Sequence, residues 1–516
     1  MAPTRWDTDV VVVGAGPVGL LLAGELRLGG AEVIVLEQLG APTTESRAST
    51  LHARTLELLD SRGLLERFGA MPREFRGHFG GLPLDLARPG PWPGPYPGQW
   101  KAAQTLTEKV LGAWAADLGA RVLRGHRLRA LRADDTGVEA VASAHGGPVR
   151  VRARHLVACD GENSTVRRLL DAPFPGQDAR RELLRADVAG LDIRDRRFER
   201  LPQGLAIAAR RPDGVTRVMV HRFGEPFRTR PGAPDFAEVA KDWLAVTGED
   251  ISGGEPLWVN AFGDANRQLA HYRHGRVLFA GDAAHVQMPA GGQALNLGLQ
   301  DAFNLGWKLA AQVRGTAPEG LLDSYHAERR PVGRRVLADI AVQADLLMGG
   351  TEAQSLRELL GELLTLGPVQ EQLAGLISGV DVDYGRETPD LLADGACGRR
   401  LPPLPLHTDA GPTTTAALQR TARGVLLVLD EEAAQAAVLH ARAWADRVEL
   451  VTARADADGP GPLAGVGALL LRPDGHLAWT SDDGDDPRPA LRRWFGAPVT
   501  PAHPLPAAPR SVKDSR

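Results

Sequence analysis

The chain has 516 residues and a formal net charge of −4, from 60 basic and 64 acidic residues. A chain of this length predicts about three domains, and the lack of excess positive charge argues against a nucleic-acid-binding protein. Hydrophobic residues make up 43% of the chain and charged residues 24%, which excludes a wholly disordered protein.

The chain has few cysteines, and its sequence predicts no membrane-spanning segment. Cys159 and Cys397 are the two cysteines, so a disulfide framework or a CxxC site is excluded. His271 and His274 stand three residues apart, but no cysteine or carboxylate cluster completes a metal site, and we expect no metal. Aliphatic runs fall far short of the ~20 residues of a membrane span. We therefore expect a reduced, soluble, cytoplasmic protein without a signal peptide.

The first 40 residues predict a β-α-β unit. A continuous apolar run at 10–13 is typical of a strand buried on both faces, and it leads into Gly14-Ala15-Gly16-Pro17-Val18-Gly19. A helix at 20–28 and a second strand at 32–37 follow. This context makes the glycine pattern a dinucleotide-binding turn instead of a chance GxGxxG.

Each part of this unit has a chemical reason. The three glycines allow a tight turn, close approach of a pyrophosphate to the backbone, and packing of the helix on the strand. The helix N-terminus offers N–H groups to the phosphates. Glu37 lies 18 residues after Gly19, close to the ~20 expected for an acid that accepts hydrogen bonds from ribose hydroxyls. The pattern alone does not distinguish FAD from NAD.

The rest of the chain predicts two further units. Alternating segments between 186 and 263 indicate a separate antiparallel sheet. Pro402-Pro403-Leu404-Pro405 precedes a last unit whose order of elements is compatible with a small thioredoxin-like domain without CxxC. The other expected elements, in chain order, are a helix at 53–62, a proline-rich loop at 83–98, a helix at 106–118, strands at 121–123, 128–133 and 138–142, a strand at 151–159 that re-enters the first sheet, a strand at 276–280, a helix at 299–313, a helical stretch at 320–380, and in the last unit strands at 425–429, 448–451, 467–471 and 476–480 with helices at 431–445 and 488–495.

A second fingerprint indicates FAD. Gly281-Asp282-Ala283-Ala284-His285 follows a strand, and Pro289-Ala290-Gly291-Gly292-Gln293-Ala294-Leu295-Asn296 precedes a helix. With Cys159-Asp160-Gly161, these segments resemble the class A flavoprotein monooxygenases of the para-hydroxybenzoate hydroxylase type. In that family the Gly-Asp aspartate bonds the ribityl chain, and the proline and the glycine-rich turn lie beside the isoalloxazine. The Asp-Gly segment is shared between flavin and nicotinamide contacts.

Four further segments narrow the resemblance. They look like the aromatic polyketide hydroxylases of antibiotic pathways, closest to the angucycline group, and comprise 77–85, 247–251, 255–263 and 472–476. The resemblance implies an α/β protein with a Rossmann-like FAD-binding domain (1–175, completed with a helical linker by 271–390), an antiparallel-sheet substrate domain (176–270) and a thioredoxin-like domain lacking CxxC (391–516). One departure concerns Ala294 and Leu295, where many relatives have Gly and Met. We expect FAD binding to be retained despite these two substitutions, whereas the resting position of the flavin could differ from that in the relatives.

The resemblance also implies a set of FAD contacts. Arg47 would face the pyrophosphate, Gln104 would bond near the flavin or ribityl chain, and Leu128 would lend its backbone to the adenine. Each residue also has a purely structural interpretation. Arg47 would form a surface ion pair, Gln104 would be a polar residue at a helix start, and Leu128 would be a core residue. The complete expected cofactor set is Gly14, Gly16, Val18, Gly19, Glu37, Gln38, Arg47, Gln104, Leu128, Asp160, Asp282, Pro289, Gly291, Gly292, Gln293 and Asn296, with Pro289 and Gly292 beside the reacting flavin.

The expected activity is hydroxylation of an angucyclinone-like polyketide with NAD(P)H and O2, through a C4a-hydroperoxyflavin. Since the chain has one dinucleotide unit, NADPH or NADH would bind transiently. Candidate substrate walls are Phe79, Leu82, Leu84, Trp100, Trp258, Asn260 and Phe262. Baeyer–Villiger oxygenation on the same fold and a non-catalytic flavoprotein that binds aromatic compounds remain alternatives, and a halogenase signature is absent. A homodimer is left open.

Overall fold

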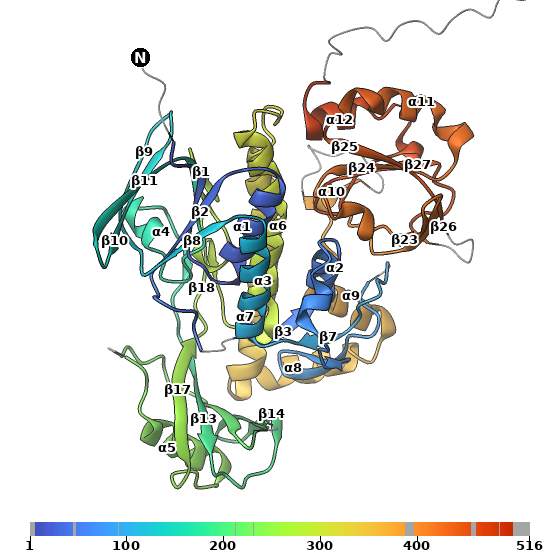
Figure 1. The fold of residues 1–516 in the computed structure, drawn as a ribbon. Helices are drawn as coiled ribbons and strands as arrows, with labels where there is room; N and C mark the ends of the chain where they lie inside the picture. Colours follow the sequence, from blue (N-terminus) through green and yellow to red (C-terminus); the bar gives the residue numbers. More distant parts are fainter. Residues whose placement is uncertain are drawn as a thin grey trace, which may run out of the picture.

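In the computed structural model, the described residues are 6–44, 48–90, 92–211, 213–230, 232–387, 397–455, 461–484 and 486–498. Three lobes are visible: a large sheet-and-helix body, an antiparallel sheet beneath it, and a C-terminal lobe packed on its side (Figure 1). The expected α/β fold with a parallel central sheet and separate antiparallel sheets is confirmed. Among the described residues, no helix is both long enough and apolar enough to cross a bilayer.

The central sheet has the strand order β19-β20-β11-β1-β2-β8. Its strands β20, β11, β1, β2 and β8 are parallel, and Val10–Val13 are at most 5% exposed because helices cover both faces. The bounds are β1 Thr8–Val13, β2 Val33–Glu37, β8 Arg121–Arg124, β9 Arg127–Ala133, β10 Val138–Ala144, β11 Gly147–Ala158, β19 Arg273–His274 and β20 Val277–Phe279, with helices α1 Pro17–Leu28, α2 Ala53–Asp60, α3 Gln104–Asp117 and α4 Thr165–Leu169.

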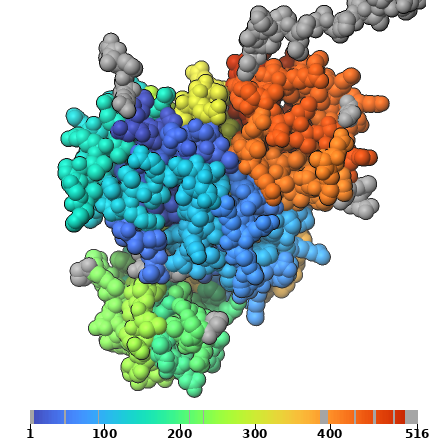
Figure 2. All heavy atoms as spheres, in the orientation of Figure 1, coloured from blue at the N-terminus to red at the C-terminus, as the bar shows by residue number. Residues whose placement is uncertain are grey.

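The second sheet is fully antiparallel, in the order β14-β15-β16-β13-β17. One face packs on helix α5, whose Trp243 is fully buried against strand residues such as Leu184 and Ala186. The bounds are β13 Glu182–Ala189, β14 Arg196–Leu201, β15 Gly204–Arg210, β16 Thr216–Arg222, β17 Glu255–Gly263 and α5 Phe236–Thr247. This lobe extends away from the other two (Figure 2).

Short strands form small separate sheets, in the orders β12-β18-β21, β3-β7-β4 and β5-β6. The segment 83–98 was expected to be a loop, but its first three residues belong to β6, which pairs with β5 in a hairpin. Pro83 is tolerated in this strand because a two-stranded ribbon leaves one edge of each strand unpaired. The bounds are β3 Thr50–His52, β4 Arg73–Glu74, β5 Arg76–Phe79, β6 Leu82–Asp85, β7 Gln99–Lys101, β12 Gly176–Gln177, β18 Asn266–Gln268 and β21 His285–Val286.

Two long helices run behind the sheets. Helix α6 begins at Gln293, six residues earlier than expected, directly after the glycine-rich turn. It is buried along most of its length against the central sheet and α7. The bounds are α6 Gln293–Val313, α7 Asp323–Met348, α8 Gln354–Leu363, α9 Gly367–Ser378 and α10 Tyr384–Glu387.

The C-terminal lobe has its own four-stranded sheet, in the order β25-β24-β27-β28. Strands β24 and β25 are parallel and joined through α11, and β27 and β28 are antiparallel and followed by α12. The bounds are β22 Pro405–Thr408, β23 Gly411–Thr414, β24 Gly424–Val428, β25 Val448–Thr452, β26 Arg454–Ala455, β27 Ala468–Leu471, β28 Leu477–Thr480, α11 Glu431–Ala441 and α12 Arg488–Phe495. The small sheet of β22, β23 and β26 was not expected.

Candidate functional site

The GxGxxG residues form the turn between β1 and α1. Gly14 has a φ of 104°, a conformation that favours glycine. A Cβ on Gly19 would lie 2.0 Å from the Gly14 carbonyl oxygen, so helix-on-strand packing excludes a side chain there. A Cβ on Gly16 would meet no atom within 4 Å. This open space at the N-terminus of α1 fits a pyrophosphate, which backbone N–H groups and the helix dipole stabilise.

Glu37 holds this turn at the end of β2. Its carboxylate accepts hydrogen bonds from the backbone N–H groups of Ala15 and Leu39, both at 2.7 Å. The carboxylate therefore lies directly beside the glycine turn, where a ribose hydroxyl can reach its remaining lone pairs.

The Gly281-Asp282 segment lies at the end of β20, in the same sheet as β1. Asp282 has an exposed side chain, while Gly281 and Ala283 on either side are buried. The Gly281 N–H donates to Asp301 on α6 at 3.2 Å, and the His285 imidazole contacts the same carboxylate oxygen at 2.8 Å. Asp301 on α6 thus anchors the segment, while the Asp282 side chain is exposed on its surface.

The glycine-rich turn lies between β21 and α6. Gly291 and Gly292 have φ values of 60° and 70°, so both adopt the left-handed conformation. Asn296 ties the turn to β3: its side chain accepts from the His52 N–H at 2.9 Å and donates to the carbonyls of Thr50 and Gly292. The structure thus gives Asn296 a bracing role within the protein.

The other expected FAD contacts differ in position. Gln104 begins α3 and bonds Glu108 at 2.9 Å, whereas Leu128 is a core residue at 4% exposure. Asp160 accepts from the first N–H groups of α4. Val18 packs against Gly281. The remaining residues are Gln38, which is exposed, Pro289, which is exposed, Gln293, which is buried and bonded to Gln343, and Arg47, which lies outside the described residues.

A cavity of about 710 Å³ opens beside the glycine-rich turn. Its floor is the segment from Met288 to Gly292, and its opposite wall is the free face of the antiparallel sheet. Both apolar and charged side chains from several strands line the cavity. The main lining residues are Thr50, His52, His78, Gln99, Lys101, Leu183, Arg185, Arg197, Leu205, Ile207, Met219, Phe262, Met288, Pro289, Gly291 and Gly292.

The expected substrate walls are only partly in this cavity. Phe262 lines it, and Trp258 stacks on the lining residue Arg185 with the guanidinium 4.5 Å from the ring centroid. Asn260 pairs with Arg185 across β13 and β17, which places it on the same face of the sheet. The other four expected residues lie elsewhere: Phe79, Leu82 and Leu84 pack in a cluster with Leu346, and Trp100 packs on the central core.

Strand alternation explains the displacement of Trp100. Gln99 and Lys101 on β7 line the cavity, so Trp100 between them points to the other face. Sequence reasoning also missed His78, whose Nδ1 accepts from the Gly81 N–H at 3.2 Å. Burial, and then the charge of Arg197, lower the pKa of His78 to about 3. His78 is therefore neutral, with its proton on Nε2.

His52 is held in a similar neutral state. Its Nε2 lies 2.7 Å from the Gly291 carbonyl oxygen, which can only accept, so Nε2 carries the proton. Burial lowers the pKa of His52 to about 4. The imidazole therefore fixes the glycine-rich turn at neutral pH.

Comparison with known protein families identifies the class. Residues 7–339 match the FAD binding domain family, and residues 394–498 match the aromatic-ring hydroxylase C-terminal family. The first match covers more than half of the chain, so the protein belongs to the FAD binding domain family, and its C-terminal part matches that of the aromatic-ring hydroxylases.

Named relatives and a solved structure resemble the chain over nearly its whole length. The chain is 43% identical to the 12-dehydrotetracycline 5-monooxygenase/anhydrotetracycline 6-monooxygenase of Streptomyces rimosus, over 95% of this chain and 99% of the relative. It is 40% identical to the rifampicin monooxygenase of Streptomyces venezuelae, with the same coverage. Among solved structures, an aromatic hydroxylase from angucycline biosynthesis superposes with a TM-score of 0.89 at 46% identity, over 95% of this chain and 100% of that chain.

The residues present fit FAD. The open space at Gly16, the acid at Glu37 and the outward Asp282 lie at the carboxyl ends of parallel strands, where α/β sheets bind nucleotides. The resemblance to polyketide hydroxylases and the assignment of FAD as cofactor are thereby confirmed.

Proposed function

We propose that this enzyme hydroxylates a flat, polycyclic, phenolic polyketide with O2 and NAD(P)H, in antibiotic biosynthesis. The single observation that carries the proposal is the cavity of about 710 Å³ between the glycine-rich turn and the antiparallel sheet. A volume of this size is typical of pockets for drug-sized ligands. The relatives named for tetracycline and angucycline oxidation support the polyketide class.

We assign the FAD contacts as follows. Gly16 and the N-terminus of α1 would take the pyrophosphate, Glu37 a ribose, and Asp282 the ribityl chain. Pro289, Gly291 and Gly292 would lie beside the isoalloxazine, with Gln104 and Asp160 nearby. We retain Arg47 on the family resemblance alone. FAD, when bound, supplies hydride acceptance and O2 activation.

The protein's own residues bind and orient the substrate. The apolar lining residues Leu183, Met219 and Phe262 would cover the aromatic rings and exclude water. His78 would donate its Nε2–H to a substrate oxygen. Lys101, held by Glu74 at 3.3 Å, would favour an ionised phenol at the other edge.

We also propose the division into 1–175, 176–270, 271–390 and 391–516, with a thioredoxin-like fold for the last part. The parallel β24-α11-β25 unit followed by antiparallel β27 and β28 supports that fold. Within the described residues this lobe has Cys397 and no second cysteine, so its contribution would be structural.

The experiment is incubation of the FAD-loaded enzyme with NADPH, O2 and a panel of tetracyclic phenols and quinones that includes anhydrotetracycline. We expect substrate-stimulated NADPH oxidation and a product that gains one oxygen atom as a new hydroxyl. A lactone product would instead establish Baeyer–Villiger oxygenation, and no stimulation by any compound would contradict the proposal.

A further inference from the structure

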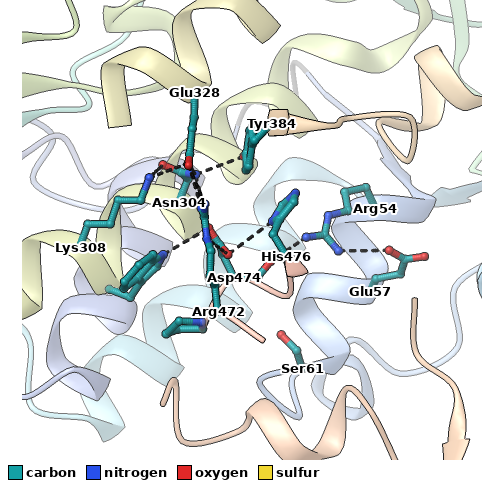
Figure 3. A network of polar contacts seen from close by, with 12 residues as sticks. Arg54, Glu57, Ser61, Asn304, Lys308, Glu328, Tyr384, Arg472, Asp474 and His476 are labelled. Carbon is teal, nitrogen blue, oxygen red and sulfur yellow. Dashed lines mark hydrogen bonds and ion pairs between the residues drawn. The ribbon is translucent and has the colours of Figure 1, made fainter. Parts of the chain in front are cut away.

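A cluster of buried charges joins the C-terminal lobe to the flavin-binding body (Figure 3). Arg472 lies in the turn between β27 and β28, and Glu328 lies on α7. Two nitrogens of Arg472 bond the two Glu328 oxygens at 2.6 and 2.9 Å. Both side chains are 1% exposed. Such a two-point contact fixes orientation as well as distance.

Helix α6 is part of this cluster. Lys308 contacts Glu328 at 2.6 Å and the Asn304 side-chain oxygen at 2.8 Å. The Asn304 amide donates to Glu328 at 2.7 Å, and the Trp307 indole donates to Asp474, beside Arg472, at 3.2 Å. The C-terminal turn therefore holds the second half of α6 through buried polar contacts.

A second buried cluster lies one turn closer to the flavin site. Arg329 on α7 bonds Asp301 on α6 at 2.8 Å, and both are fully buried. Asp301 in turn holds Gly281 and His285, as described above. This cluster supports the segment that carries Asp282.

The two clusters are connected. Glu328 and Arg329 are consecutive on α7, and Asp301, Asn304 and Lys308 recur at the three- and four-residue spacing of one helix face. The Tyr384 hydroxyl contacts the Asn304 amide at 3.2 Å and the Arg329 guanidinium at 3.3 Å. Buried contacts thus run without a break from the C-terminal turn to Gly281.

Because these charged groups are buried, the loss of one partner carries a large energetic cost for the other. A buried charge that loses its partner is strongly destabilised, so neighbouring groups must rearrange if Arg472 is altered. The groups available for rearrangement are Glu328, Lys308 and Asn304, which share their helices with Arg329 and Asp301. We therefore expect a change at Arg472 to alter the position of the backbone at Gly281, which Asp301 holds.

We propose that Arg472 is a positioning residue for FAD: the C-terminal lobe sets the placement of Gly281-Asp282 through Glu328, Arg329 and Asp301. This role would explain a lobe that contributes no side chain to the described lining of the cavity. The proposal rests on the assignment of Asp282 to FAD.

The test uses the FAD-loaded enzyme and two mild variants. Arg472→Lys keeps the charge but loses the two-point contact, and Tyr384→Phe removes one bridging hydroxyl. We expect each variant to release FAD about fivefold faster, measured by the rise of free-flavin fluorescence after dilution, and to shift the flavin midpoint potential. The matched control is Arg447→Lys, which alters an arginine that donates to the Phe495 carbonyl at 2.6 Å inside the C-terminal lobe. It should leave both readouts at wild-type values.

A double-mutant cycle separates coupling from general loosening. Arg472→Lys combined with Asp301→Asn should speed FAD release by less than the product of the single effects. If both Arg472→Lys and Arg447→Lys lower the thermal midpoint while FAD release and potential stay unchanged, the lobe is merely structural and the proposal is overturned. A wild-type protein that binds no FAD would overturn the proposed function instead.

Discussion

Gly19 lies so close to Gly14 that a Cβ on Gly19 would sit 2.0 Å from the Gly14 carbonyl oxygen, whereas a Cβ on Gly16 would meet no protein atom within 4 Å. The two glycines of one motif thus serve different purposes. Gly19 permits the packing of α1 on β1, and Gly16 keeps space for a ligand.

This difference predicts opposite effects of two substitutions. Gly16→Val should leave the thermal midpoint of the FAD-free protein near the wild-type value but abolish the yellow colour, because the branched side chain occupies the phosphate approach. Gly19→Ala should lower the midpoint of the FAD-free protein itself. Thermal unfolding without FAD and absorbance with FAD check both. Equal loss of stability in the two variants would contradict the assignment.

Asp282→Ala should weaken FAD binding by about 10- to 100-fold, the range for a hydrogen bond to a charged acceptor. The Asp282 side chain is exposed, so we expect little change in folding stability. Fluorescence titration with FAD measures the effect, and Glu319→Ala, at another exposed acid, is the control. An unchanged flavin spectrum would argue against the ribityl assignment.

Phe262 and Phe79 should respond differently to truncation. Phe262 lines the cavity, so Phe262→Ala should weaken substrate binding and increase NADPH oxidation without product. Phe79 is 5% exposed in a separate cluster, and Phe79→Ala should cost about 3–5 kcal/mol of unfolding free energy. Substrate titration and urea unfolding of both variants check the contrast. The reverse pattern would return Phe79 to the substrate wall.

Stability should fall on acidification below pH 6.5. Burial lowers the pKa of His52 and His476 to about 4 and of His155 to about 3. Between these values and 6.5 the unfolded chain binds more protons, so stability is present above 6.5 and is lost toward pH 4. Each histidine contributes about 1.4 kcal/mol per pH unit.

Urea unfolding at pH 7 and pH 5 measures this loss. His155→Gln should reduce the loss by about 2 kcal/mol, because one titrating group is removed. His145→Gln is a matched control, since His145 lies in the turn between β10 and β11. Equal losses in the His155 variant and the wild type would contradict the buried neutral state.

The local geometry of the proposed cofactor site was largely predictable because short segments of the chain set it. Gly14, Gly16, Gly19 and Glu37 belong to one β-α-β unit, and Asp282 directly follows a strand, so short sequence patterns capture them. The roles of Asn296 and Asp301 were not predictable in the same way. Their partners lie on β3, on α7 and in the segment from Gly281 to His285, and only the tertiary fold brings these parts together.

The cavity proposed for the substrate was less predictable because its lining depends on strand register. A shift of one residue moves a side chain to the other face of a strand, and nothing in the short segment around Trp100 indicates that Gln99 and Lys101 face inward. His78 and Arg197 come from separate hairpins and strands. Leu82 and Leu84, proposed as substrate walls, lie on β6 and pack with Leu346, a partner on α7 that no short segment around them indicates.

One face of the antiparallel sheet lines the cavity, and the other packs against α5. Leu183 and Arg185 on β13 border the cavity, while Leu184 and Ala186, which alternate with them along the strand, pack against α5. Exchanges at every second position can therefore reshape what the enzyme accepts while the lobe's own scaffold stays intact. New substrate preferences on this framework need no wholesale redesign, only a few well-chosen replacements along one side of five strands.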